Sequence, residues 1–163
     1  MKRLFALTLP ALLMACAPGT IPGVRTFENQ ASHVTGRIDY PQDPPAGGAH
    51  NPAWQNCGTY DRQLYDEYAV HSLEHGAVWI LYRTGIAVDQ VQQLQEAIKG
   101  QPRTLLSPYS DLRSPVVVVA WNAQLDLDST TDPRLLKFIL NYGQGSAAPE
   151  AGGPCSGGYA ETS

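Results

Sequence analysis

The order of apolar and polar residues along the chain predicts four short strands. Residues 77–82 and 116–121 are continuous apolar runs, which are typical of buried strands. Apolar and polar side chains alternate over residues 123–128, which predicts a strand with one solvated face. Residues 104–106 form a further short apolar segment that we interpret as a strand. The valine-rich run at 116–121 is expected to lie at the centre of a sheet.

Three other segments carry helix signals. Residues 66–75 begin with two acidic residues, which suit the positive end of the helix dipole, and Gly76 suits the helix end. Residues 88–99 place valine, leucine and isoleucine at helical spacing. Residues 132–142 begin with Asp-Pro, a common cap and first helical position, and carry a second apolar face. We therefore expect helices over these ranges.

The order of these elements predicts an α+β fold. Helices and strands follow one another without the strict alternation that a parallel α/β sheet requires. Each amphipathic helix must bury its apolar face against the sheet. We therefore expect a two-layer sandwich, in which helices cover one face of a mainly antiparallel sheet. A ferredoxin-like topology is one candidate for this arrangement.

The first segment, residues 1–15, has the features of a bacterial lipoprotein signal peptide. Two basic residues precede an apolar run that is too short to cross a bilayer, which takes about 20 residues. The run ends in Leu13-Met14-Ala15-Cys16, which resembles a lipobox. In that signal the bond before the cysteine is cut and the cysteine is lipidated. An ordinary secretory signal with a chance cysteine is the alternative.

The remaining chain is expected to form a linker over residues 16–32 and a single domain over residues 33–163 with a Gly/Pro-rich tail. A lipid on Cys16 would anchor the domain outside the cytoplasm, in the periplasm or at the cell surface. Without Lys2 and Arg3, the eleven basic residues become nine, against fifteen acidic ones. This balance argues against nucleic acid as a partner, because nucleic acid attracts clustered Lys and Arg. Any protein partner, substrate and oligomeric state stay open.

Cys57 and Cys155 are the two cysteines of the predicted domain. An even pair outside the cytoplasm usually forms a disulfide, and each of these cysteines lies in a Gly/Pro-rich stretch. Such a bond would tie the tail to the loop that precedes residue 66. The alternative is that one or both cysteines are thiolate ligands of a metal ion.

The histidines suggest a metal site. His71 and His75 are four residues apart, so a helix places both on one face, where they can hold one ion. Two ligands are too few for a metal site, which needs three or four. His50, at the end of a Gly-Gly turn, is the best third ligand, and His33 is the natural fourth. Glu74 lies between the paired histidines as a ligand, a partner of the ligands or a base.

The donor types favour copper. Histidine nitrogens and a carboxylate suit Cu(II) or Zn(II), and the Irving–Williams order places copper above zinc in affinity. Both methionines lie in the signal segment, which argues against a methionine-rich Cu(I) carrier. The leading interpretation is therefore a lipid-anchored copper-binding protein with a role in binding, transfer or resistance. Zinc is the alternative ion.

Two other hypotheses stay open. One is a small zinc- or copper-dependent hydrolase with Glu74 as general base. The segment His71-Ser-Leu-Glu74-His75 resembles the His-x-x-Glu-His pattern of inverzincin peptidases, where the glutamate activates water. Those enzymes take a glutamate ligand from a downstream helix, and the helix predicted from Asp132 contains no Glu. The other is a structural or interaction lipoprotein without metal. We favour metal binding over catalysis.

A broader resemblance covers most of the predicted domain. Several short motifs recur in order: His33-Val-Thr-Gly, the stretch 44–50, Cys57-Gly-Thr-Tyr, the stretch 70–78, the stretch 115–121 and the stretch 153–158. Together they resemble an uncharacterised family of bacterial secreted proteins that is known mainly as a domain of unknown function. The resemblance implies that all four histidines and both domain cysteines occupy motif positions. It implies no activity. One departure is Gly47-Gly-Ala-His50, where the family suggests a form closer to Ser-Gly-Pro-His.

Overall fold

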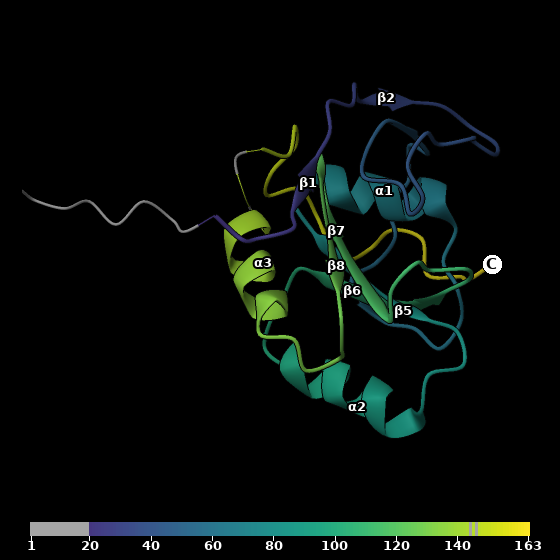
Figure 1. Cartoon of the computed structure of the whole chain (residues 1–163). Helices are drawn as coiled ribbons and strands as arrows, with labels where there is room; N and C mark the ends of the chain where they lie inside the picture. Colours follow the sequence, from purple (N-terminus) through teal and green to yellow (C-terminus); the bar gives the residue numbers. More distant parts are fainter. Residues whose placement is uncertain (1–19, 144, 146) are drawn as a thin grey trace, which may run out of the picture.

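A six-stranded mixed sheet lies at the centre of the computed structural model, which describes residues 20–143, 145 and 147–163 (Figure 1). Its strands are β1 (Arg25–Thr26), β4 (Gly58–Thr59), β5 (Val78–Arg83), β6 (Thr104–Tyr109), β7 (Val116–Ala120) and β8 (Ala123–Leu127). Their order is β1-β8-β7-β5-β6-β4. The pairings from β1 to β5 are antiparallel, and β5, β6 and β4 run parallel. The predicted signal peptide and Cys16 lie outside the described residues.

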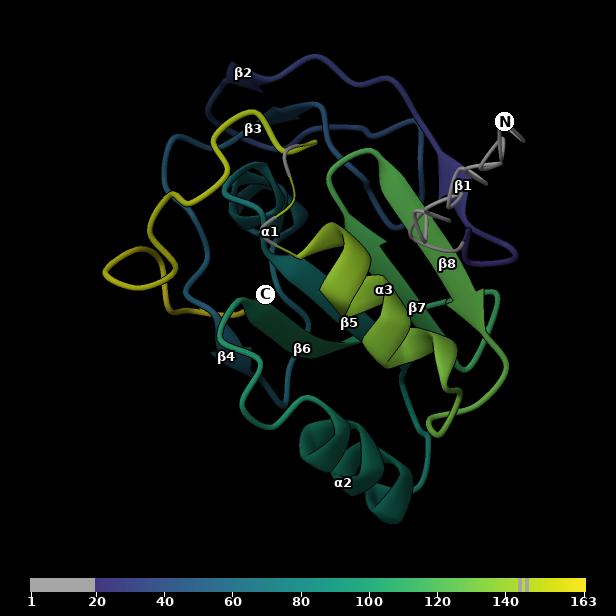
Figure 2. The same cartoon turned by 90° about the vertical axis from the view of Figure 1, so that its left-hand side faces the viewer.

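The α+β class is confirmed, but the prediction that the helices cover one face is wrong. The helices are α1 (Asp66–Glu74), α2 (Val88–Ala97) and α3 (Arg134–Tyr142). Figures 1 and 2 show α2 and α3 on one side of the sheet and α1 on the other. The cause is visible in β5. Ile80 packs with Leu94 and Phe138 of the two outer helices, whereas Trp79 and Leu81 pack with α1.

The continuous apolar runs therefore mark strands that are buried on both faces. Strands β5 and β7 lie between two hydrophobic layers, so successive side chains enter different cores. A ferredoxin-like topology is not confirmed. In that topology another strand separates the two strands of each split βαβ unit. Here β5 and β6, which α2 connects, are direct neighbours.

The boundaries of the helices agree with the prediction to within two residues. The expected exposure of two side chains is wrong. Leu140, which was expected on the buried face of the last helix, is 71% exposed. Gln124 was expected on the solvated face of its strand and is buried. Its side-chain amide donates a hydrogen bond to the carbonyl of Pro44, and Arg25 and Arg113 donate to its side-chain oxygen. A loop therefore covers the polar face of β8.

A small second sheet and a disulfide organise the segments around α1. Strands β2 (Ser32–His33) and β3 (Ala49–His50) pair in parallel. Cys57 and Cys155 form the predicted disulfide, with their Cα atoms 5.2 Å apart. The bond holds the C-terminal tail against the segment before α1. Within the part of the chain that the structure describes, no helix is both long and apolar enough to cross a membrane.

Candidate metal centre

The end of α1 presents two histidine rings to each other. His71 lies in the last turn, and His75 caps the helix before Gly76 takes a φ of 86°, the left-handed conformation that ends many helices. The next strand begins at Val78, so the helix end is held directly against the core. The Nε2 atoms of His71 and His75 lie 3.0 Å apart. The predicted i, i+4 pair therefore exists on a rigid element.

The small sheet brings the other two histidines to this helix end. His33 and His50 are register partners of β2 and β3, and the backbone amide of Val34 donates to the carbonyl of His50 at 2.8 Å. The ring centroids of His33, His50 and His71 are each 4.9 Å from one another. Three separate segments of the chain thus converge on one point.

Glu74 completes this group. Its Oε2 atom lies 2.8 Å from Nε2 of His50 and 3.6 Å from Nε2 of His33, and its side chain is 5% exposed. One ligand atom from each of His33, His50, His71 and Glu74 lies within 4.8 Å of every other. A buried histidine and glutamate cluster with this spacing could hold a metal ion.

Hydrogen bonds to backbone carbonyls orient three of the rings. The Nδ1 partners are Gly48 for His50 at 2.8 Å, Asn51 for His71 at 2.6 Å and Pro154 for His75 at 2.7 Å. A carbonyl oxygen only accepts, so each Nδ1 carries the proton. In a neutral ring, Nε2 then has a free lone pair. This is the arrangement of histidines that bind metal through Nε2.

Two buried atoms of the cluster have no hydrogen-bond partner among the described residues. Nε2 of His50 and Oε2 of Glu74 are buried and form no hydrogen bond, although they are 2.8 Å apart. Nε2 of His71 faces Nε2 of His75, and in neutral rings both nitrogens are acceptors. Buried acceptors that face one another are unfavourable unless a cation or proton lies between them. A cation at this point could satisfy these acceptors.

Protonation of His71 is disfavoured by its surroundings. Burial lowers the pKa of this ring, and the neighbouring rings of His75, His50 and His33 lower that pKa further. The hydrogen bond to Asn51 opposes this shift. The ring is therefore neutral at neutral pH, which leaves its Nε2 lone pair available.

A second set of donors overlaps the first. His71, His75 and Glu150 also bring one ligand atom each within 4.8 Å of one another. Oε2 of Glu150 lies 3.5 Å from Nε2 of His75, and the Glu150 side chain is 55% exposed. The four predicted histidines do lie close together. His75, however, contacts the other three through His71. Glu150 was not predicted as a ligand from the sequence. The only sequence feature near it was Cys155 of the predicted disulfide, five residues later.

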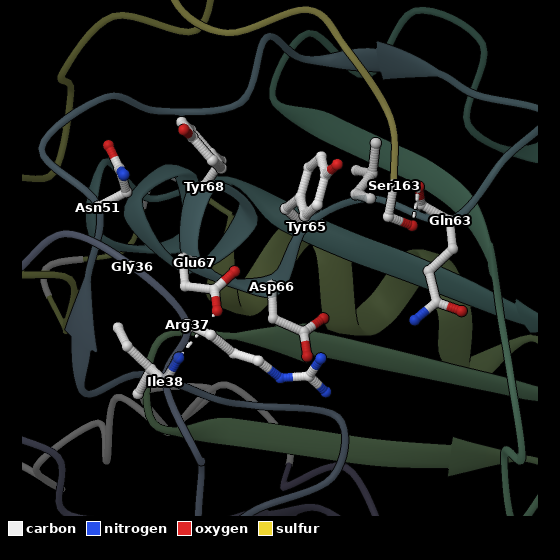
Figure 3. A pocket seen from close by; sticks show the side chains of 11 residues that line it. Gly36, Arg37, Ile38, Asn51, Gln63, Tyr65, Asp66, Glu67, Tyr68 and Ser163 are labelled. Carbon is white, nitrogen blue, oxygen red and sulfur yellow. Dashed lines mark hydrogen bonds between the residues drawn. The ribbon is translucent and has the colours of Figure 1, made fainter.

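A cavity lies at the first turn of α1, the end of the helix away from His71 and His75. It has a volume of about 540 Å³, and the first turn of the helix lines it (Figure 3). Asp66, Glu67 and Arg37 bring charge to its wall. Burial raises the pKa of Asp66 to about 7, and the charge of Arg37 opposes that shift. None of the four histidines lines this cavity, but Asn51, whose carbonyl accepts from Nδ1 of His71, does.

Comparison with protein families places this arrangement in a known group. A family model described as "Protein of unknown function (DUF3105)" matches residues 33–157, which is more than half of the chain. The chain belongs to the DUF3105 family. The predicted membership of a family of unknown function is thereby confirmed. The DUF3105 match begins at His33 and spans the cluster and the disulfide. No curated protein and no solved structure matches the chain.

Proposed function

We propose that this DUF3105 protein binds one copper ion outside the cytoplasm through His33, His50, His71 and Glu74. The observation that carries the proposal is the convergence of histidine nitrogens on Glu74, with Nδ1 of His50 and His71 hydrogen-bonded to backbone carbonyls. A set of donors that is already oriented pays little ordering entropy when an ion binds. Its role would be metal binding, transfer or resistance.

The chemistry of the donors supports copper over zinc. Imidazole nitrogens suit both ions, and Cu(II) stands above Zn(II) in the Irving–Williams order. The disulfide occupies both described cysteines, so neither thiolate is available to the ion. This disfavours a thiolate site of the kind that selects Cu(I).

The proposed location rests on two features. A disulfide persists in an oxidising compartment, which is consistent with an extracytoplasmic protein. The sequence Leu13-Met14-Ala15-Cys16 supports a lipid anchor on Cys16, although that segment lies outside the described residues. Mass spectrometry of the mature N-terminus tests the anchor: a diacylglyceryl group on Cys16 supports it, and an unmodified Cys16 argues against it.

The alternative hydrolase has weaker support. A general base must reach a water bound at an open position of the metal, whereas the Glu74 carboxylate lies against His50 and near His33. This position suits a ligand or a residue that orients ligands. Among the four proposed ligands His33 is the exposed one, with its side chain 46% exposed. Binding is therefore the function that the geometry supports best.

Metal analysis tests the proposal. Untagged protein is loaded with Cu(II) or Zn(II), desalted and assayed for metal. We expect close to one copper per chain in wild type, and at least a tenfold loss in His71→Ala and His50→Ala. Glu161→Gln is the control, because it removes an exposed carboxylate that belongs to neither donor set. Equal metal content in all four proteins would exclude the site and leave a structural role for the histidines.

A further inference from the structure

The two donor sets share His71 and differ in the number of donors. The inner set consists of His33, His50, Glu74 and His71, and the outer set consists of His71, His75 and Glu150. Each set has one exposed member: the side chain of His33 is 46% exposed, and that of Glu150 is 55% exposed. The other members are buried. An ion on the three outer donors would therefore keep a coordination position open to an incoming ligand.

His71 can serve only one of the two positions at a time. An imidazole bridges two ions only when both ring nitrogens are free, and Nδ1 of His71 carries its proton to the carbonyl of Asn51 at 2.6 Å. Its single Nε2 lone pair must therefore choose between the positions. Without His71 the outer set keeps two donors, which are too few to hold an ion firmly. The geometry is that of one ion with two positions.

The backbone that carries Glu150 is tied to the end of α1. The amide of Glu150 donates to the carbonyl of Glu74 at 3.0 Å, and the amide of Gly152 donates to the carbonyl of His75 at 3.1 Å. The guanidinium of Arg103 donates to the carbonyls of His75 at 3.2 Å and Gly153 at 2.7 Å. The exposed carboxylate is therefore held beside His75 instead of being left on a free tail.

We propose that His71, His75 and Glu150 form a transfer position, through which the copper ion passes between solvent and the inner set. This inference rests on the proposed function. The ion first meets the exposed Glu150, then the buried His75 and His71, and Nε2 of His71 moves with the ion to the inner set. The three outer donors leave an open position at which an incoming or departing ligand can hold the ion. The partner that this position fits is a copper complex or chelator that exchanges one ligand at a time.

Exchange kinetics test the transfer position. Full-length, untagged protein in detergent is loaded with Cu(II), mixed with excess EDTA and followed by the loss of the copper absorption. Uptake is measured with Cu(II) alone. Removing a ligand from the transfer position raises the free-energy barrier to both uptake and release. We therefore expect Glu150→Gln to slow both rates by about tenfold or more. Its copper stoichiometry and its dissociation constant, within about threefold, should stay those of wild type. Glu161→Gln should exchange like wild type.

The outcomes separate the two proposals. If wild type binds no copper, the proposed function fails. If copper binds and Glu150→Gln exchanges at the wild-type rate, only the transfer position fails. A weaker affinity with faster release would make Glu150 a resident ligand and overturn the inference. So would a stoichiometry of two that falls to one in Glu150→Gln. A second variant, His75→Gln, should slow exchange in the same way and guards against a local effect of Glu150→Gln.

Discussion

The two ends of α1 carry titratable groups, the half-buried Asp66 and the buried His71, whose protonation shifts in opposite directions. At the first turn, burial raises the pKa of Asp66 to about 7, so this carboxyl retains a proton at mildly acid pH. At the last turn, burial lowers the pKa of His71, so this ring sheds its proton. Burial disfavours the charged form of both groups. The acid therefore becomes a donor and the imidazole becomes an acceptor.

The groups around each end of α1 determine the effect of this change in protonation. Tyr109 lies with its hydroxyl 2.8 Å from Asp43 and 3.2 Å from Asp66, so one extra proton satisfies a carboxyl and tyrosine network. Around His71 and Glu74, the facing atoms are acceptors drawn from three segments. A proton satisfies the carboxyl and tyrosine groups at the first turn of α1. A cation of higher charge suits the acceptors at its last turn. A buried titratable group does not by itself indicate a possible metal site, whereas several acceptors that converge on one point do.

The largest expected effect comes from separating the tail from the histidine end. Cys57→Ser with Cys155→Ser opens a loop of 98 residues, and we expect the free energy of unfolding to fall by up to about 4.7 kcal/mol. Denaturant titration measures this loss. The double variant should also exchange copper differently, because Glu150 loses its covalent support beside His75. An unchanged unfolding midpoint would show that the tail is held by its hydrogen bonds alone.

The second effect is stabilisation by metal at the histidine end only. With free copper at about 100 times the dissociation constant, the free energy of unfolding should rise by about 2.7 kcal/mol. His71→Ala should lose this gain, and Asp66→Asn should keep it. Thermal unfolding with and without copper measures the difference. A gain that survives in His71→Ala would place the ion elsewhere on the chain.

The third effect is a pH dependence at the opposite end. Because the folded pKa of Asp66 is about 7 and its ordinary value is 3.8, the folded state keeps a proton that the unfolded state has released in this window. The contribution of Asp66 to stability is complete below about pH 4 and is lost as pH rises through 7. Metal-free Asp66→Asn should therefore gain about 2 kcal/mol on wild type between pH 4 and pH 6. Asp61→Asn, at an exposed position, should show no such gain.

The smallest effect distinguishes the roles of Glu74. Glu74→Gln keeps the shape of the side chain and removes its charge, so copper affinity should fall by about tenfold, or about 1.4 kcal/mol. Competition with a chelator of known affinity measures it. A general base would give a different result, with copper affinity retained and any hydrolytic activity lost.

Local patterns predicted much of the fold and part of the site. The helix over 66–75, the apolar strands, the disulfide and the gathering of the histidines all appear in the structure. These features depend on neighbours in sequence, on composition or on covalent chemistry. The two-sided burial of the sheet escaped prediction, although the apolar run of β5 carried the signal. A run that is apolar at every position has no periodicity from which to choose a face.

The sequence by itself determined that the chain carries four histidines, of which two share one face of a helix, and a cysteine pair that an oxidising compartment joins. Only the tertiary structure decided which donors meet. It aligned His33 with His50, placed Glu74 between them and brought Glu150 to His75. It also placed Nδ1 of His50, His71 and His75 against backbone carbonyls. The reason is that ligand geometry depends on contacts between distant segments, which spacing along the chain does not encode.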